Sequence, residues 1–454
     1  MWTIVKRELL DHLVTLRFSA LFALTFLLMT MTVLVFSGDY ARRMREYPRR
    51  VEGFVDDDGR VHLGWIACQG VGVRAVPSPL AFLSAAGDRV LPNRVSLALH
   101  AVSTIERAAG PGDAIGGDNG TDWTFIISAL LSFGAGLLTY KSISGERRDG
   151  TLTLVMAHPL SRATLLAAKY LAAMIALGAV LTISMLAGAI LLRALGTVPM
   201  SADDWWKLIM FGALALVFLS FFVLTGLACS VWTRSPVLSA VAFLFTWMTL
   251  VFVVPNLGGI LAGLTGTVPS PLSIREAART IPDRYTLTPS MSAVDADRVK
   301  LDRESARERM VLDYLGALTR QVDLGRDLTR VSPASAFAYA AERIAGSGTL
   351  RLDRFVRNAV EYRRGFLEAV IAADRTDPQS EHRYVPWWCG GNHFSQRTVD
   401  PGPQKEFHDT LPTGSEGVAA AGWDIAALLL ENLIAFALAF WRFARQDVAP
   451  VPGT

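Results

Sequence analysis

The sequence predicts an all-α membrane protein, built as a six-helix transmembrane bundle with two large extracytoplasmic insertions. Of its 454 residues, 51% are hydrophobic and only 19% are charged, and the mean hydropathy is +0.34. A soluble chain of this length is rarely so apolar. Six stretches are long enough to cross a bilayer, which takes about 20 apolar residues. The formal net charge is only +3, which argues against a nucleic acid partner.

Residues 1–17 have the pattern of an amphipathic interfacial helix. Apolar residues such as Trp2, Val5 and Leu9 recur at helical spacing, and most charged residues fall elsewhere on the helical wheel. Such a helix lies on the membrane surface. The same residues could instead form the first turns of a long first span. No small-residue cleavage site follows the first apolar run, so we expect a retained span and not a signal peptide.

The predicted spans divide the rest of the chain. They are residues 18–37, 123–141, 165–193, 207–229, 237–262 and 420–441. Between and after them lie the insertion 38–122, the segment 142–164, the insertion 263–419 and the tail 442–454. The two insertions are too long to be turns. Pro255, followed by Gly258 and Gly259, predicts a break in the fifth span.

The short connecting segments set the orientation, because cytoplasmic loops carry an excess of Lys and Arg. Segment 141–169 has five basic residues, whereas hairpin 194–206 has none and carries Asp203 and Asp204. We therefore expect a multi-pass protein of the cell (inner) membrane with both termini and 142–164 in the cytoplasm. The arginines between 42 and 50 disagree with this orientation, but they open a long insertion, to which the rule applies weakly.

The two insertions differ in pattern. The first has strand-like runs around "VEGFVDDDGRVHLGW", where Asp58-Gly59 favours a hairpin turn over a calcium loop, so this insertion is mixed α/β. The second is mainly helical. Its stretches 299–323, 334–346 and 351–374 mix apolar and charged positions as solvent-facing helices do. Residues 376–417 are rich in Gly and Pro, which indicates irregular structure.

No residue pattern predicts catalysis. The string "GAGLLTYKS" at 134–142 has Tyr140 where a phosphate loop needs its second Gly. His382, Cys389, His393 and His408 are too irregularly spaced to predict a metal site. We therefore expect no catalytic, cofactor-binding or metal-ligating residue. Whether Cys68 and Cys389 pair stays open.

Glu431 and Asn432 form a candidate polar site inside the sixth span. A carboxylate at this depth is costly and usually faces a bundle interior or an aqueous path. A translocation route and a hydrogen-bonding tie to a neighbouring helix both remain open. Asp424 and Arg193 lie near the outer boundary, where we expect them to reach interfacial water.

The segment "SISGERRDGTLTLVMAHPLSRATLLAAK", residues 142–169, predicts a short cytoplasmic helix. Glu146 to Asp149 form a charged entry, and Gly150-Thr151 break the chain before a new helix. Leu152, Leu154 and Val155 then make an apolar face that needs a partner. Pro159 ends this helix, and Ser161 can cap the next one.

This segment resembles the coupling helix of type 2 ABC transporter permeases. The match is carried by "E-x-x-x-G-T-L" at 146–152, "HPLSR" at 158–162 and Lys169, with His158 where a smaller residue is commoner. The relevant branch includes gliding-motility and copper-enzyme-maturation permeases. Residues 77–95 and 331–366, and the closing "FARQDV", resemble the members with two enlarged extracytoplasmic loops.

The resemblance implies a permease subunit that is not itself an enzyme. Two such chains, identical or sister, would pair, and each would dock on an ABC ATPase that binds ATP and Mg and drives export or mechanical work. The implied ATPase-docking residues are Glu146, Arg147, Gly150, Thr151, Leu152, Leu154, Val155, Pro159, Ser161 and Arg162. The three apolar ones would fill the ATPase's groove, and Glu146, Arg147 and Arg162 would contact its rim. Membrane lipid and an extracytoplasmic protein are further candidate partners. A membrane-anchored sensor or interaction scaffold, acting through its extracytoplasmic domains, is the alternative.

Overall fold

The computed structural model describes residues 1–47, 60–64, 71–85, 91–98, 101–106, 121–157, 161–265, 285, 288, 290–383, 393–399 and 406–445. Its helices are α1 Trp2–Leu13, α2 Leu16–Glu46, α4 Trp123–Ile126, α5 Ser132–Thr139, α6 Ser144–Arg148, α7 Thr151–Met156, α8 Arg162–Leu195, α9 Ala202–Trp232, α10 Pro236–Met248, α11 Val254–Thr265, α13 Ala293–Thr329, α14 Pro333–Ala345, α15 Gly348–Asp374, α16 Gly414–Ala420 and α17 Gly422–Ala444. Two π-helical turns, η2 Ile127–Leu131 and η3 Thr249–Val253, interrupt them. This predominance of helix confirms the predicted fold class.

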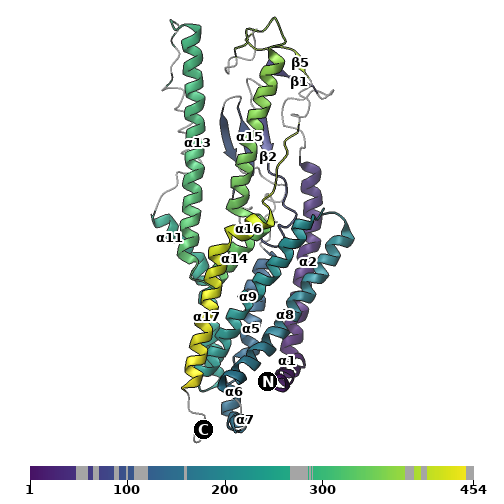
Figure 1. Ribbon diagram of the computed structural model, residues 1–454, viewed down its shortest axis with the longest axis vertical. Coiled ribbons are helices and arrows are strands. Elements are labelled where there is room, and N and C mark those ends of the chain that lie inside the picture. Colours follow the sequence, from purple (N-terminus) through teal and green to yellow (C-terminus); the bar gives the residue numbers. More distant parts are fainter. Residues whose placement is uncertain are drawn as a thin grey trace.

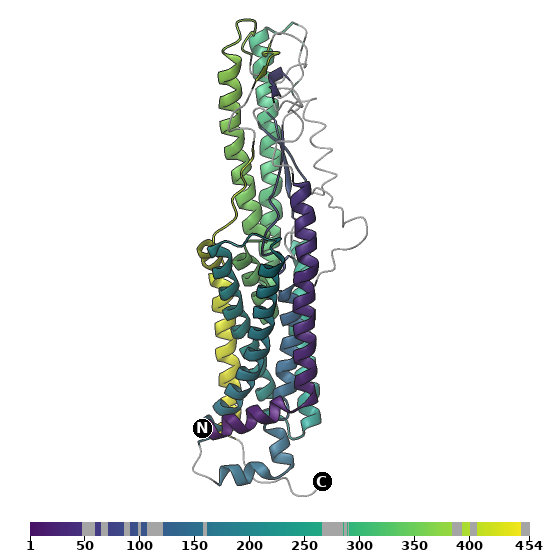
Figure 2. The same ribbon diagram turned by 90° about the vertical axis from the view of Figure 1, so that its right-hand side faces the viewer.

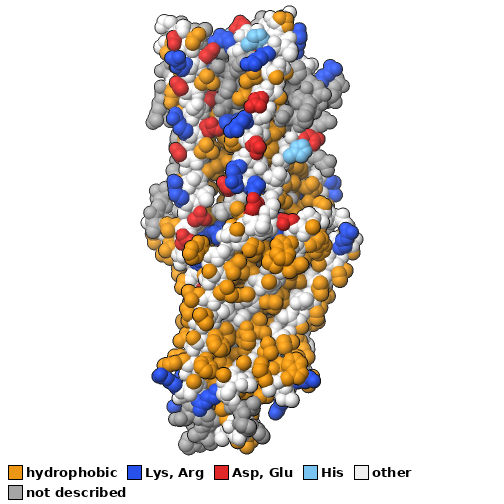
Figure 3. Space-filling model, viewed as in Figure 1, with side chains coloured by type: hydrophobic (Ala, Val, Ile, Leu, Met, Phe, Trp, Pro, Cys, Tyr) orange, Lys and Arg blue, Asp and Glu red, His pale blue; other side chains and the backbone are white. Residues whose placement is uncertain are grey.

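The molecule is elongated (Figure 1), with its hydrophobic surface at one end and most of its charged side chains at the other (Figure 3). We call the end that carries α1, α6 and α7 the basal end, and the end that carries α13, α15 and the strands the distal end. Within the described residues, six helical stretches are long and apolar enough to cross a membrane, as predicted. They are Leu16–Arg45, Trp123–Arg148, Arg162–Leu195, Ala202–Trp232, Pro236–Gly258 and Gly422–Ala444.

Helix α9 forms the centre of the bundle and packs against α5, α8, α10, α14 and α17. Its Phe211, Phe218 and Phe222 are completely buried. Small residues bring α5 close to it: a Cβ atom on Gly226 would stand 3.3 Å from the Cα atom of Gly136. Because lipid gives apolar helices little reason to associate, such close backbone packing is a main source of cohesion in a membrane bundle.

The N-terminal segment is a separate helix, so the alternative of a continuous first span is wrong. Helix α1 ends before Thr15, whose hydroxyl accepts a hydrogen bond from the Phe18 amide and starts α2. Figure 2 shows α1 lying across the basal end, roughly perpendicular to the spans. Its Val5 is buried against Ala168 and Ala172 of α8. Helix α2 continues to Glu46, well beyond the predicted end at 37, because the arginines and Ala41 that follow are good helix formers and outweigh the single Gly38.

The fifth span changes its helical geometry near the predicted break. The π-helical turn η3 ends two residues before Pro255, and α11 then continues to Thr265. A proline removes a helical hydrogen bond and crowds the preceding turn, which accounts for the local widening. Gly258 then packs tightly against α13, because a Cβ atom there would stand 3.0 Å from the Gly325 carbonyl oxygen.

The two insertions form one distal unit. The strands of the first insertion are β1 Val61–His62, β2 Val71–Arg74, β3 Arg94–Leu97 and β4 Val102–Glu106, and the second contributes β5 Thr398–Val399. Strands β2, β3 and β4 form an antiparallel sheet, and β1 pairs with β5. Asp409 of the second insertion, fully buried, binds Arg351 and accepts from the Val76 amide at 2.9 Å. The predicted turn at Asp56 to Asp58 lies outside the described residues.

The prediction that residues 334–346 face solvent is wrong. Most of α14 is buried, including Ala336, Phe337, Ala340 and Ala341, and the helix packs against α9 and α17. Glu342, whose charge made this stretch look solvent-facing, pairs with the buried Arg326 of α13. Small side chains let α14 fit between longer helices. The same pattern of alanines occurs in buried and in solvent-facing helices, so the sequence alone does not distinguish them.

Asp424 was expected to reach interfacial water, and this expectation is also wrong. Its side chain is completely buried at the start of α17, where it binds Arg330 at 2.7 Å and Arg343. The carboxylate therefore ties the sixth span to α13 and α14, as two partners compensate for its lost hydration. Arg193 is exposed, in agreement with the expectation.

Candidate docking site at the basal end

Helices α6 and α7 project below the bundle, beyond α1 (Figure 2). Gly150 makes the turn between them with a φ of 71°. Nothing lies within 4 Å of the place where its Cβ atom would stand, so the left-handed backbone, and not crowding, accounts for glycine here. The break predicted at Gly150 is therefore confirmed.

The start of α6 is held by a residue of α9 that no sequence motif singles out. Ser230, near the end of α9, is completely buried. Its hydroxyl oxygen accepts hydrogen bonds from the amides of Ile143 and Ser144 at 2.9 and 3.0 Å. These are amides that the first turn of a helix leaves without intrahelical partners. The projecting segment is thus held rigidly on α9.

Lys169 joins three basal helices. Its ammonium group donates to Glu8 of α1 at 2.6 Å and to Glu146 of α6 at 2.7 Å, while the side chain itself is only 2% exposed on α8. A buried ammonium is costly unless paired. Nearby, burial lowers the pKa of His12 below its ordinary 6.5, which keeps that imidazole neutral near pH 7. We call Glu8, Glu146 and Lys169 the basal ion cluster.

The charged residues expected at the rim of a docking groove are engaged within the chain. Arg147 is only 7% exposed and donates to the Thr233 carbonyl oxygen at 3.0 Å. Arg162 donates to the carbonyl oxygens of Phe443 and Ala444 at 2.8 Å. Carbonyl groups at helix ends lack intrahelical donors, so they attract such side chains. A rim position for Arg147 is therefore wrong. Glu146 joins α6 to α8 through Lys169, and Arg162 joins the start of α8 to the end of α17.

The apolar residues of α7 divide into two groups. Leu152 is 2% exposed and belongs to the core of the bundle, so its predicted place in a partner's groove is wrong. Val155 is half-buried against the same core. Leu154, in contrast, is 70% exposed. Of the three predicted anchors on α7, Leu154 is therefore the one that is exposed enough to contact a partner.

The remaining predicted residues have local roles. Thr151 is exposed, and its hydroxyl donates to the Glu146 carbonyl oxygen at 3.2 Å. Ser161 caps α8 by accepting from the Thr164 amide at 3.1 Å, which confirms the predicted cap. Pro159 lies outside the described residues.

Basic and aromatic side chains surround the basal end. Arg442 lies 5.9 Å from the ring centre of Trp232, and Arg445 lies 4.8 Å from that of Trp441. Figure 3 shows the hydrophobic surface of the bundle bounded below by basic residues. Tryptophan and arginine are enriched at the boundary between hydrocarbon and water. This margin is what a membrane-spanning bundle presents at the boundary between membrane and water.

Glu431 and Asn432 differ in their surroundings. Asn432 donates to the carbonyl oxygens of Val217 in α9 and Leu428 at 3.1 and 2.8 Å. It is therefore a tie between neighbouring helices. One carboxylate oxygen of Glu431 is buried and has no hydrogen-bond partner among the described residues. Glu431 therefore stays a candidate for a translocation route or for a tie to a neighbouring helix.

The histidines of the second insertion do not gather into a site within the described residues. His382 Nδ1 lies 2.9 Å from Asp374 Oδ2, and His393 pairs with Glu381. The Ser380 hydroxyl donates to Asp374 and not to the imidazole of His382. No group of three metal-ligating side chains occurs in the described part of the chain. Cys389 lies outside it.

A family model described as ABC-2 family transporter protein matches residues 2–448. The match includes the basal segment, all six apolar stretches and both insertions. No curated protein matches the chain.

Proposed function

This chain belongs to the ABC-2 transporter family, and we propose that it is the permease subunit that couples ATP hydrolysis by a separate ATPase to export, or to mechanical work, across the cell (inner) membrane. The observation that carries this proposal is the projecting segment α6–α7, with Leu154 exposed at its end and the basal ion cluster at its root. An anchor on a rigid support is what a docking helix requires.

In this proposal the basal end faces the cytoplasm and the distal end lies outside. The basic margin at Trp232 and Trp441 supports this orientation. So does the acidic hairpin at the other end of the spans, where Asp203 pairs with Lys207. Both termini and residues 142–164 are then cytoplasmic, and the insertions 38–122 and 263–419 are extracytoplasmic.

Leu154 inserts into an apolar groove of the ATPase. A movement of that groove then pulls on α7, and α6 transmits it through Glu146 to Lys169 in the third span and to Glu8 in the interfacial helix. Ser230 carries the same movement to α9. Rigid, buried contacts are suited to this because they pass on displacement instead of absorbing it.

ATP and Mg belong to the partner ATPase, and this chain contributes no catalytic residue. A second permease, either another copy or a sister chain, completes the transporter. Exposed apolar residues on α10 and α17, such as Phe245 and Leu433, face lipid or that second permease. The distal unit is large enough to bind cargo or an extracytoplasmic protein.

Copurification with the ATPase tests the proposal. Leu154→Asp should weaken binding by about 2 kcal/mol, or about 30-fold in Kd, as expected for a truncated interface anchor. Thr153→Asp is the matched control, because it adds the same charge to an exposed neighbour on the same helix and removes no apolar anchor. Leu152 is left unchanged, since its replacement would damage the bundle itself.

Equal binding of the parent and Leu154→Asp would contradict docking through α7. Failure of any ATPase to copurify with the parent chain would favour the alternative, a membrane-anchored sensor or scaffold that acts through the distal unit. That alternative does not explain why Leu154 is exposed at the end of the projecting segment.

A further inference from the structure

Helix α14 reaches deep into the bundle although it belongs to the second insertion. The Phe337 ring stacks on that of Phe218, with ring centres 4.5 Å apart and planes 15° apart. It also lies 5.9 Å from Phe211. Phe218 is near the middle of α9, so α14 descends from the distal side to about half the depth of this span. In Figure 1, α14 lies below α16 and between the spans.

The first insertion sends a second apolar segment to the same place. Leu80, Phe82 and Leu83 are buried in the core of the bundle. The carbonyl oxygens of Phe82 and Leu83 accept from the amides of Trp123 and Thr124 at 2.9 and 3.0 Å, and so cover the start of α4. The Phe82 and Trp123 rings lie 5.0 Å apart.

A continuous set of rings connects the two segments. Trp123 follows Phe82 and lies 6.4 Å from Phe211, which in turn contacts Phe337. The segments are also joined directly, because the buried Ser347 hydroxyl, just after α14, donates to the Ser84 carbonyl oxygen at 2.9 Å. We call residues 78–85 together with α14 the outer lid. It fills the distal end of the bundle between α4, α9 and α17.

The outer lid is held in place by contacts that are able to separate. Apart from Phe337, α14 meets the spans mainly through small residues, among them Ala334, Ala340 and Ala341. Its Ser335 is 2% exposed, and the hydroxyl has no hydrogen-bond partner among the described residues. A buried polar group without a partner is costly. Water reaching Ser335 in an opened state would remove that cost, which would offset part of the packing lost on opening.

Charged residues link the outer lid to the sixth span and to α13. Arg343 of α14 donates to Asp424 and to the Ala420 carbonyl oxygen, at the junction of α16 and α17. Glu342 pairs with Arg326 of α13. A displacement of the sixth span is therefore passed to α14 by a buried ion pair.

We propose that the outer lid is the extracytoplasmic gate of this permease, and that residues 78–85 leave α4 and α14 leaves α9 together, as one body, when the ATPase binds ATP. This inference rests on the proposed function. It gives the two insertions a role in closing the bundle from outside, in addition to any contact with cargo or partner.

Cysteine labelling tests the gate. Single cysteines replace Ser335 or Ser84 in a chain whose Cys68, Cys229 and Cys389 are changed to Ala. The membrane-impermeant probe is a charged maleimide, added from outside to the assembled complex, first without nucleotide and then with ATP, Mg and vanadate. Asp353→Cys, whose parent side chain is 63% exposed on α15, is the control for accessibility.

Without nucleotide, Ser335→Cys and Ser84→Cys should be protected and Asp353→Cys labelled. Trapping with ATP and vanadate should raise the labelling rate of both lid cysteines by about tenfold or more, and by the same factor. A rise at Ser335→Cys alone would overturn the movement as one body. Protection of both cysteines in a complex that hydrolyses ATP would overturn the gate and leave the proposed function intact. Absence of an ATPase from the complex would overturn the proposed function and the ATP-driven gate together.

Disulfide locks supply a second measurement. A bond between cysteines at 218 and 337 should fix α14 to α9 and abolish the ATP-dependent labelling of Ser84→Cys. A bond between Ser84→Cys and Ser347→Cys joins residues 78–85 to the turn that follows α14, where the two segments already touch, and should leave the labelling of Ser335→Cys unchanged. If the 84–347 bond also abolishes labelling, the two segments move apart during opening and the proposal fails.

Discussion

Replacing Lys169 by Met tests whether the basal ion cluster holds α1, α6 and α8 together. The ammonium is 2% exposed and lies 2.6 and 2.7 Å from its two carboxylate partners, Glu8 and Glu146. Its removal leaves two carboxylates facing one another without a cation. Breaking a buried pair in this way costs about 3–5 kcal/mol. The two glutamates retain 18% and 24% exposure, so water screens part of the repulsion and we expect about 3 kcal/mol.

The quantity to measure is the free energy of unfolding in mixed micelles, by titration with a denaturing detergent. Lys141→Met is the matched control, since Lys141 is exposed at the same end and its loss should cost less than about 0.5 kcal/mol. Adding Glu8→Gln and Glu146→Gln to Lys169→Met removes the unpaired charges, and it should restore about half of the lost stability.

Two results would refute this reasoning. One is a Lys169→Met chain as stable as the parent to within about 0.5 kcal/mol. The other is a triple variant no more stable than Lys169→Met, which would show that the cost comes from lost packing of the lysine stem and not from the unpaired carboxylates.

Three further predictions follow from the orientation, the lack of a phosphate loop and a buried lysine. In intact cells, Asp353→Cys should react with an impermeant maleimide and Leu154→Cys should not; the reverse pattern would invert the proposed topology. The purified chain should neither bind nor hydrolyse ATP, and turnover that persists after contaminating ATPases are removed would contradict the assignment of ATP to a partner. Burial lowers the pKa of Lys300 from 10.5 to about 8, with Asp297 opposing the shift. Between pH 8 and 10.5 the unfolded chain then binds more protons than the folded one, so stability should rise with pH across that window, and Lys300→Met should abolish the rise if the cause is correct.

The features that were predicted correctly are those encoded within a few neighbouring residues. Six spans follow from local hydropathy, the turn at Gly150 from its freedom to adopt positive φ, and the cap at Ser161 from a hydroxyl before a helix. Each of these depends on chemistry that a short stretch of chain already contains. Packing against helices from distant parts of the chain does not change these spans, this turn or this cap.

The features that were missed depend on contacts far apart in sequence. Nothing near Leu152 distinguishes it from Leu154, yet one is in the core and the other is exposed. Asp424, at the start of the sixth span, looked like an interfacial residue because its partners, Arg330 and Arg343, come from the second insertion. A pattern of apolar and polar residues specifies a face of a helix, but it does not specify what covers that face.

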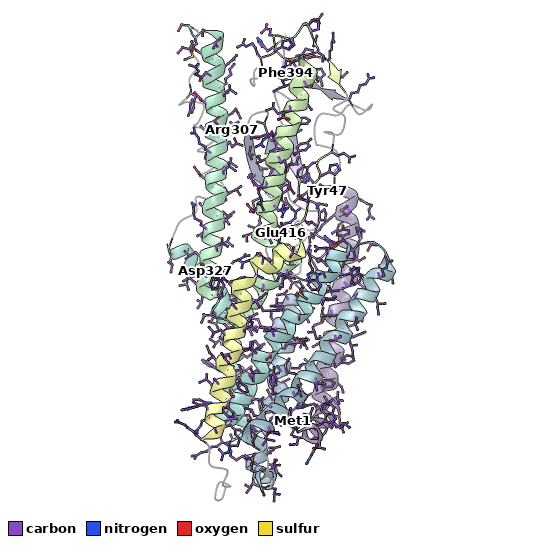
Figure 4. The ribbon with its side chains drawn as sticks, viewed as in Figure 1. Met1, Tyr47, Arg307, Asp327, Phe394 and Glu416 are labelled. Carbon is purple, nitrogen blue, oxygen red and sulfur yellow. The ribbon has the colours of Figure 1, made fainter. Side chains whose placement is uncertain are left out.

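The junction between the bundle and the distal unit was likewise beyond local reasoning. Glu416 lies at this junction (Figure 4) and pairs with Arg354 of α15. The backbone amide of Thr413, which donates to its carboxylate, is the main reason that the pKa of Glu416 lies below its ordinary value. The capping box of α16 joins Thr413 and Glu416, three residues apart, whereas the pairing of Glu416 with Arg354 of α15 spans 62 residues.

The pairing of β1 with β5 has a consequence for biosynthesis. His62 and Thr398 are partners across this ladder although 336 residues separate them. At about 5–20 residues per second, a ribosome needs roughly 20–70 s to make the intervening chain. During that interval four further spans must enter the membrane while the first insertion is without its partner strand. In the proposed orientation the first insertion is then already exported, so it would be exposed to proteases and chaperones outside the membrane before the distal unit closes, and slow translation would lengthen that exposure.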